Sequence, residues 1–255
     1  MKHLTSKLIF LIFSYFLLNI FHSSYSIVLN RAQLKAWLGT SFATGLTSLT
    51  LSRRNITSIS NDTFTGFFYL TSLYLENNLI TYVHPSVFSD LKNLTSLSLS
   101  FNLIDHLDDY TFASLEKLQV LYFTTNKLTY LNENTLTGMT RLQVLWLQVN
   151  SLTRIDPLAF SQLKNLQSIV LEKNNLSYVA SHTFANQNKA IDLSLSFNRF
   201  TCLNESGLFM GLDNLKSLYL NDNQITYISN DIFEGLDNLI TLNLANNSLS
   251  SLDFD

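Results

Sequence analysis

A segment of eleven residues recurs along most of this chain at a spacing of 24 residues, and this repetition limits the fold more than any other feature. In the copy from Leu70 to Ile80 the pattern is L-x-x-L-x-L-x-x-N-x-L, with Ile in the last position. A repeat of this length predicts a solenoid in which each unit buries its apolar face only against its neighbours. The asparagine recurs as Asn78, Asn102, Asn126, Asn150, Asn174, Asn198, Asn223 and Asn247, every step being 24 residues except the last but one, which is 25.

Each position of the pattern has a predicted structural role. The L-x-L triplet predicts a short strand, with Leu73 and Leu75 pointing inward and Tyr74 outward. Stacked copies place these strands side by side, about 4.8 Å apart, in a parallel sheet. The asparagine follows the strand, where its amide both donates and accepts, so it is expected to satisfy backbone groups of adjacent turns. We therefore expect a ladder of asparagines along the solenoid.

The second half of each copy carries one aromatic position. A column of this kind at the repeat spacing predicts core packing beneath the convex side rather than a ligand site. The position is occupied by Phe64, Phe88, Phe112, Phe160, Phe184, Phe209 and Phe233, with Leu136 in the fourth unit.

Residues 1–26 have the pattern of a secretory signal peptide. A basic start with Lys2 and Lys7 precedes the apolar run from Leu8 to Phe21, and small residues allow cleavage after Ser26. The alternative is an uncleaved anchor helix, for which the run is short, because a span needs about 20 apolar residues.

The remainder of the chain divides into a cap and the repeats. Residues 27–45 are expected to form an N-terminal cap, in which Asn30 caps a helix from Arg31 to Leu38 that ends at Gly39. Residues 46–255 are expected to form nine repeats with the last one truncated. This leaves apolar positions at the C-terminal edge uncovered, so either the chain is a fragment or another chain covers that edge.

From Asn30 onward the chain resembles the typical, 24-residue class of extracellular leucine-rich repeat proteins, which includes Toll-like receptors, Slit-type guidance proteins and small leucine-rich proteoglycans. The resemblance implies an α/β repeat solenoid, a horseshoe with a parallel β-sheet on its concave face. It implies little about the ligand, because these proteins share the scaffold and differ at exposed positions. The disulfide-bonded caps of these relatives have no counterpart here, since Cys202 is the single cysteine.

Composition and charge narrow the function classes. Charged residues make up only 14% of the chain and the formal net charge is −3, so no basic field draws in nucleic acid. No nucleotide-binding, metal or nucleophile motif is present, so we expect neither an enzyme nor a cofactor. His84, His106 and His182 are expected in separate convex-side loops, each without a recurring carboxylate or nucleophile partner, and Asp108 with Asp109 is expected in a solvated loop. Cys202 is either an inert, half-buried thiol or a site of intermolecular pairing.

Outward strand positions line the concave face, where a solenoid usually binds its ligand. Aromatic residues there predict a contact patch centred on Trp146 and Tyr122. The alternative is that the rings only stabilise the sheet across neighbouring strands. The predicted ligand-binding residues are Tyr74, Tyr122, Trp146, Val170 and Tyr219.

Six Asn-x-Ser/Thr sequons are candidate glycosylation sites, which would suit a secreted chain. Asn246 is expected beside the concave face of the last repeat. The sequons are Asn55, Asn61, Asn93, Asn175, Asn204 and Asn246.

Two functions remain open at this point. The first is a secreted or cell-surface recognition module that binds a protein or glycan ligand through its concave face. The second is a structural component of the extracellular matrix, which self-associates through the uncapped C-terminal edge. Contact with a membrane is expected only through a missing C-terminal segment or a co-receptor.

Overall fold

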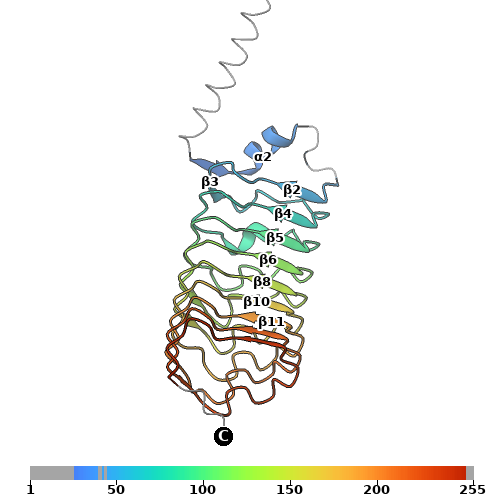
Figure 1. The fold of residues 1–255 in the computed structure, drawn as a ribbon. Coiled ribbons are helices and arrows are strands. Elements are labelled where there is room, and N and C mark those ends of the chain that lie inside the picture. The colour runs from blue at the N-terminus through green and yellow to red at the C-terminus, as the bar shows by residue number, and fades with distance from the viewer. Residues whose placement is uncertain (1–25, 40–41, 43–44, 251–255) are drawn as a thin grey trace, which may run out of the picture.

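The computed structural model describes residues 26–39, 42 and 45–250 of the 255 residues. The expected signal peptide lies outside this part of the chain, apart from its last residue. The described chain winds into a solenoid whose turns stack in sequence order, with a short helix at the N-terminal end (Figure 1).

Nine short strands, one from each repeat, form a single parallel sheet along one side of the solenoid. Neighbouring L-x-L triplets pair residue for residue, as Leu73 does with Leu97 and Leu97 with Leu121. This arrangement confirms the predicted leucine-rich repeat horseshoe with its parallel sheet. In sheet order the strands are β2 (Ser48–Thr50), β4 (Ser72–Tyr74), β5 (Ser96–Ser98), β6 (Val120–Tyr122), β8 (Val144–Trp146), β10 (Ser168–Val170), β11 (Asp192–Ser194), β13 (Ser217–Tyr219) and β15 (Thr241–Asn243).

The remaining strands pair in twos, away from the main sheet. They are β1 (Ile27–Leu29) with β3 (Ile56–Ile59), β7 (Tyr130–Leu131) with β9 (Arg154–Ile155), and β12 (Cys202–Leu203) with β14 (Tyr227–Ile228). A 3-10 helix, η2 (Pro85–Phe88), forms one of the convex turns.

The N-terminal helix α2 (Arg31–Leu38) has the predicted bounds. The side chain of Asn30 accepts a hydrogen bond from the backbone N–H of Gln33 at 2.8 Å, which satisfies one of the free donors at the helix start. Gly39 follows the helix with a positive φ of 55°. Leu34 is fully buried, so the helix packs one face on the first repeat.

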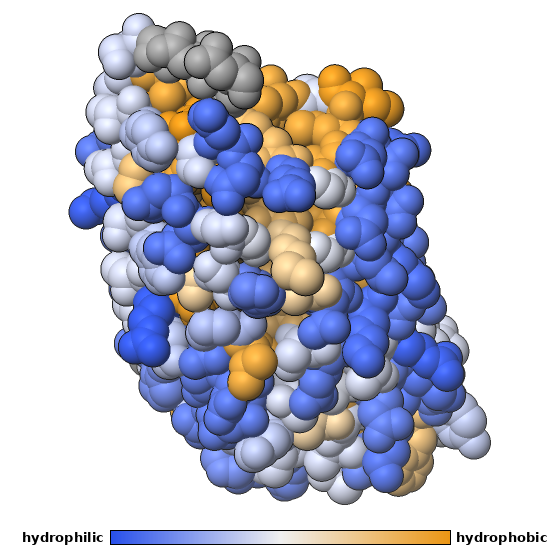
Figure 2. Space-filling view, turned by 90° about the horizontal axis from the view of Figure 1, so that it is seen from below, coloured by the Kyte–Doolittle hydropathy of each residue, from blue (hydrophilic) through white to orange (hydrophobic). Residues whose placement is uncertain are grey.

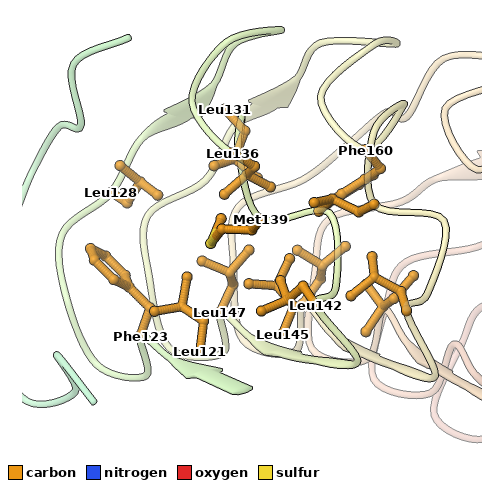
Figure 3. Packing of buried hydrophobic residues seen from close by; sticks show 14 of the residues in the cluster. Leu121, Phe123, Leu128, Leu131, Leu136, Met139, Leu142, Leu145, Leu147 and Phe160 are labelled. Atoms are coloured by element: carbon orange, nitrogen blue, oxygen red, sulfur yellow. The ribbon is translucent and has the colours of Figure 1, made fainter. Parts of the chain in front are cut away.

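The interior is filled by the leucines of the strands and by apolar residues of the convex turns. Leu121, Leu145 and Leu147 from the sheet side meet Leu136 and Met139 from the opposite side in the same close-packed layer (Figure 3). Burying a side chain of this size stabilises the fold by about 1.5–3 kcal/mol relative to leaving it exposed.

The phenylalanine column is part of this core, as predicted. Phe88 and Phe112 stack with their ring centroids 6.1 Å apart, and Phe160 and Phe184 with theirs 5.7 Å apart. Leu136, which replaces Phe in the fourth unit, is also buried.

The asparagine ladder is present as predicted. Asn126 donates from Nδ2 to the carbonyls of Leu99 and Phe123, at 3.0 and 3.4 Å, and accepts from the N–H of Ile104 at 3.1 Å. The same three-way pattern links adjacent turns at the other ladder positions. Each asparagine therefore ties its own turn to the preceding one.

Viewed from the end at which the chain stops, apolar side chains lie across the middle of the solenoid, between polar side chains on either flank (Figure 2). In the last described repeat Ile240 is 78% exposed and Leu242 39%.

Candidate ligand-binding site on the concave face

The central outward position of each strand forms a column across the sheet. In register, Tyr74 pairs with Ser98, Ser98 with Tyr122, and Tyr122 with Trp146. Ser98 is therefore a small residue between two tyrosines, and it is buried, with 6% of its surface exposed. A small residue flanked by large ones leaves a depression in the sheet surface.

A hollow of about 500 Å³ lies at this place on the concave face. Its size falls within the usual range of small-ligand sites, about 300–1,000 Å³. Four of its ten lining side chains are aromatic, one is a carboxylate and none is cationic. They are Tyr74, Glu76, Asn77, Ser98, Ser100, Phe101, Tyr122, Thr124, Trp146 and Gln148.

Tyr122 and Trp146 form an edge-to-face pair on one side of the hollow, with centroids 4.8 Å apart and an interplanar angle of 60°. This geometry contributes about 0.5–1.5 kcal/mol beyond area burial, so it also stabilises the sheet. Trp146 nevertheless keeps 38% of its surface exposed and Phe101 keeps 50%. Both interpretations of the aromatic column therefore have a physical basis here.

Two polar atoms of the hollow are buried without a hydrogen-bond partner, namely Oε2 of Glu76 and Oε1 of Gln148. Both are acceptors. Within residues 26–39, 42 and 45–250, no nitrogen of a basic side chain lies within 4.0 Å of the Glu76 carboxylate. Because an unsatisfied buried acceptor costs about 1–3 kcal/mol, these two oxygens are sites at which a donor would stabilise the protein.

The structure brings together three of the five predicted ligand-binding residues. Tyr74, Tyr122 and Trp146 line the hollow. Val170 lies next to Trp146 in β10 but not in the lining, and Tyr219 lies farther along the sheet in β13. The contributions of Glu76, Ser98 and Gln148 were not predicted, because they arise from differences in side-chain size and pairing between adjacent strands.

The six sequons differ in their surroundings. Asn61, Asn204 and Asn246 are exposed, whereas Asn55, Asn93 and Asn175 are half-buried. Nδ2 of Asn93 donates to the carbonyl of Phe68 at 2.7 Å, and Nδ2 of Asn246 donates to Oδ1 of Asp222 at 2.9 Å.

Cys202 lies in strand β12, beside one of these sequons. Its thiol is half-buried and lies 3.4 Å from Oδ1 of Asn204.

One lateral edge of the solenoid carries a cluster of aromatic and acidic side chains from adjacent turns. Tyr82 stacks on His106, with centroids 5.2 Å apart, and donates its hydroxyl to Oδ2 of Asp108. Nδ1 of His106 is also 2.5 Å from Oδ1 of Asp105, its neighbour in the sequence. The hydrogen bond to Asp108, then burial and the charge of Asp108, raise the pKa of Tyr82 to about 12. The 24-residue step places these residues in adjacent turns.

Asp108 and Asp109 lie in the loop expected for them, where Asp109 is exposed and Asp108 is half-buried. Asp108 accepts the Tyr82 hydroxyl, and Asp109 accepts from Asn132 and Asn134 of the next turn, at 2.8 and 3.1 Å. Among the described residues, no group of three His, Cys, Asp or Glu side chains is placed to hold a metal ion. The same part of the chain contains no helix with the length and hydropathy that crossing a bilayer requires.

These features define a class of protein, a parallel-stranded repeat solenoid with an aromatic hollow on its sheet surface. Residues 44–104, 92–152, 140–200 and 191–249 each match the leucine rich repeat family. The chain belongs to that family. A comparison with curated protein sequences finds no match.

Solved structures with a similar fold include three complexes. The TLR13–ssRNA13 complex matches with a TM-score of 0.69 and 30% identity over 87% of this chain and 35% of that one. The Drosophila Toll–Spatzle complex matches with a TM-score of 0.78 and 24% identity over 86% of this chain and 28% of that one. The glycosylated form of that complex matches with a TM-score of 0.75 and 21% identity over 87% of this chain and 34% of that one. This chain thus spans about a third of the length of these proteins.

Proposed function

We propose that this chain is the recognition part of a secreted or cell-surface protein and binds a protein ligand on its concave face. The observation that carries the proposal is the hollow lined by Tyr74, Tyr122 and Trp146. Tyrosine and tryptophan on a rigid sheet offer large contact areas and lose little side-chain entropy on binding. The similar structures of TLR13 and Toll are complexes, with ssRNA and with Spatzle, which supports a binding role for this scaffold.

Charge favours a protein over a nucleic acid. Binding to a phosphate backbone depends on lysine and arginine contacts, and the hollow contains one carboxylate and no cationic side chain. The expected signal peptide and the exposed sequons support an extracellular location.

The test is site-specific cross-linking by the secreted chain. A benzophenone amino acid is placed at Trp146 or, as a control outside the main sheet, at Met210, which is 54% exposed. Exposure to extracellular fluid followed by illumination is expected to give a saturable protein adduct at position 146, with unlabelled wild-type chain as competitor. Trp146→Ala should compete about thirtyfold less well, because the loss of a central aromatic contact costs about 2 kcal/mol or more.

Stability must be measured on the same variant. Trp146 points away from the core, so Trp146→Ala leaves no internal cavity. It should lower the free energy of unfolding by the ring-pair term of about 0.5–1.5 kcal/mol plus the contribution of the apolar area that the indole buries on the sheet, and the chain should stay folded. Adducts found only at position 210 would show that the ligand binds outside the concave face and would contradict the proposal. Concentration-dependent self-association without any adduct would instead favour the matrix-component interpretation.

A further inference from the structure

We propose that the hollow holds an arginine side chain of the protein ligand, with the guanidinium group between the rings of Tyr74 and Tyr122 and hydrogen-bonded to Glu76. This inference rests on the proposed function and names the chemistry that its site recognises.

The spacing of the strands leaves room for one planar group between Tyr74 and Tyr122. Tyr74 and Tyr122 lie on strands β4 and β6, which are separated by β5, so their backbones are about 9.6 Å apart, or two strand spacings. A flat group stacked between two rings needs about 7 Å, at ordinary carbon contact distances of about 3.5 Å on each side. Ser98 and Ser100 of the intervening repeat form a shallow floor that leaves this gap open.

The ring that closes one side is held in place by its neighbour. Trp146, which also lines the hollow, packs edge-to-face on Tyr122 with the ring centroids 4.8 Å apart, and this contact restricts the tyrosine ring. Arginine stacks on aromatic faces through both its charge and its planar shape, whereas lysine offers only a compact charge.

The polar groups of the hollow are matched to a cationic donor. The unpartnered oxygens, Oε2 of Glu76 and Oε1 of Gln148, are both acceptors, and arginine has five N–H donors and no acceptor. The carboxylate of Glu76 is the only formal charge among the lining residues.

The experiment follows the indole N–H signal of Trp146 by NMR, with Trp37→Phe to identify it, while small probes are titrated into the chain. The probes are N-acetyl-arginine amide, the uncharged N-acetyl-norleucine amide, and N-acetylglucosamine. We expect saturable shifts with the arginine amide alone, with a dissociation constant on the order of 1 mM for so small a ligand.

Two variants test the assigned contacts. Glu76→Gln keeps the shape of the side chain and removes its charge, and it should weaken arginine amide binding by about fivefold. Ser98→Leu fills the floor of the hollow without changing the charge, and it should abolish the shift. The matched control is Glu172→Gln, since that carboxylate already pairs with Lys173 at 3.5 Å and lies outside the lining, so binding should change by less than about twofold.

Binding of N-acetylglucosamine, equal binding of the norleucine amide, or indifference to both Glu76→Gln and Ser98→Leu would overturn the arginine assignment. None of these results affects the cross-linking at position 146. If the chain binds the arginine amide but forms no protein adduct at position 146, the hollow recognises arginine and the proposed protein ligand is overturned.

Discussion

At the residue scale, one backbone position in every repeat departs from the conformations that most side chains prefer. The residue just before each ladder asparagine has a φ between 53° and 58°, which lies in the left-handed region. Asparagine and aspartate tolerate this region, and β-branched residues do so poorly. Eight residues of this kind precede a ladder asparagine, and Arg53 holds the equivalent position before Arg54 in the first repeat. The nine residues are Arg53, Asn77, Phe101, Thr125, Val149, Lys173, Phe197, Asp222 and Asn246.

The first prediction concerns the strain at Val149, which has a φ of 56° and is 39% exposed. Val149→Asn should raise the free energy of unfolding by about 1 kcal/mol, because the left-handed conformation costs a branched side chain about 1–2 kcal/mol. Chemical denaturation measures the change. The matched control, Asn77→Val at the equivalent position, should lower stability by a similar amount. If neither Val149→Asn nor Asn77→Val differs in stability from the wild-type chain, the turn accommodates either residue without an energetic cost.

The candidate site shows how far single residues can be interpreted from the sequence. The alternation of the L-x-L triplet predicts that Tyr74, Tyr122 and Trp146 point outward. In the structure all three line the hollow on the concave face. The hollow itself depends on Ser98, a residue with no functional signature, because its small size matters only between two tyrosines. Period and alternation therefore predict the direction of a side chain, whereas cavities depend on size differences across strands.

At the element scale, the strands of the main sheet and helix α2 carry strong local signals, and both match the prediction. The two-residue strands β7, β9, β12 and β14 were not predicted, since so short a segment shows no periodicity. In two of the convex turns a glycine packs directly against the backbone of the preceding turn. A methyl group on Gly138 would meet Ala113, and one on Gly211 would meet Ala185.

The next prediction uses these turns. Gly211→Ala should destabilise the protein through both its φ of +87° and the collision with Ala185. Gly235→Ala is the matched control, because φ is +82° there and no atom lies within 4 Å of the added methyl group. Both variants carry the conformational cost of about 1–2 kcal/mol, and Gly211→Ala should lose about 1–3 kcal/mol more from the forced backbone shift. If Gly211→Ala and Gly235→Ala unfold at the same denaturant concentration, the backbone of the neighbouring turn shifts to admit the methyl group at no energetic cost.

At the scale of the whole molecule, the asparagine ladder shows how stability is distributed. Contacts between strands run only to neighbours in the stack, which is the arrangement of a quasi-one-dimensional solenoid. The carbonyl of Leu99 accepts from Asn102 at 2.9 Å and from Asn126 at 3.0 Å, so two successive asparagines share one acceptor. The same sharing at Leu75, Phe123, Leu147, Leu171, Leu195 and Leu220 links the turns into a continuous chain.

This sharing makes a prediction about coupling. Asn126→Leu alone leaves the N–H of Ile104 without its partner but leaves Leu99 bonded to Asn102, so it should cost about 1–3 kcal/mol. Adding Asn102→Leu removes the second donor of the Leu99 carbonyl. The double variant should therefore lose about 1–3 kcal/mol more than the sum of the two single variants, measured as a double-mutant cycle in denaturant.

The control for this cycle pairs Asn102 with Asn198, which share no acceptor and lie four repeats apart. Their effects should add to within about 0.5 kcal/mol. Additivity in both pairs would show that water replaces the lost donor at Leu99 and that the turns are bound independently. Coupling in both pairs would show that the solenoid unfolds as one unit whose stability does not divide by repeat. Coupling confined to adjacent asparagines would locate the cooperativity of this fold in the carbonyls that two successive repeats share.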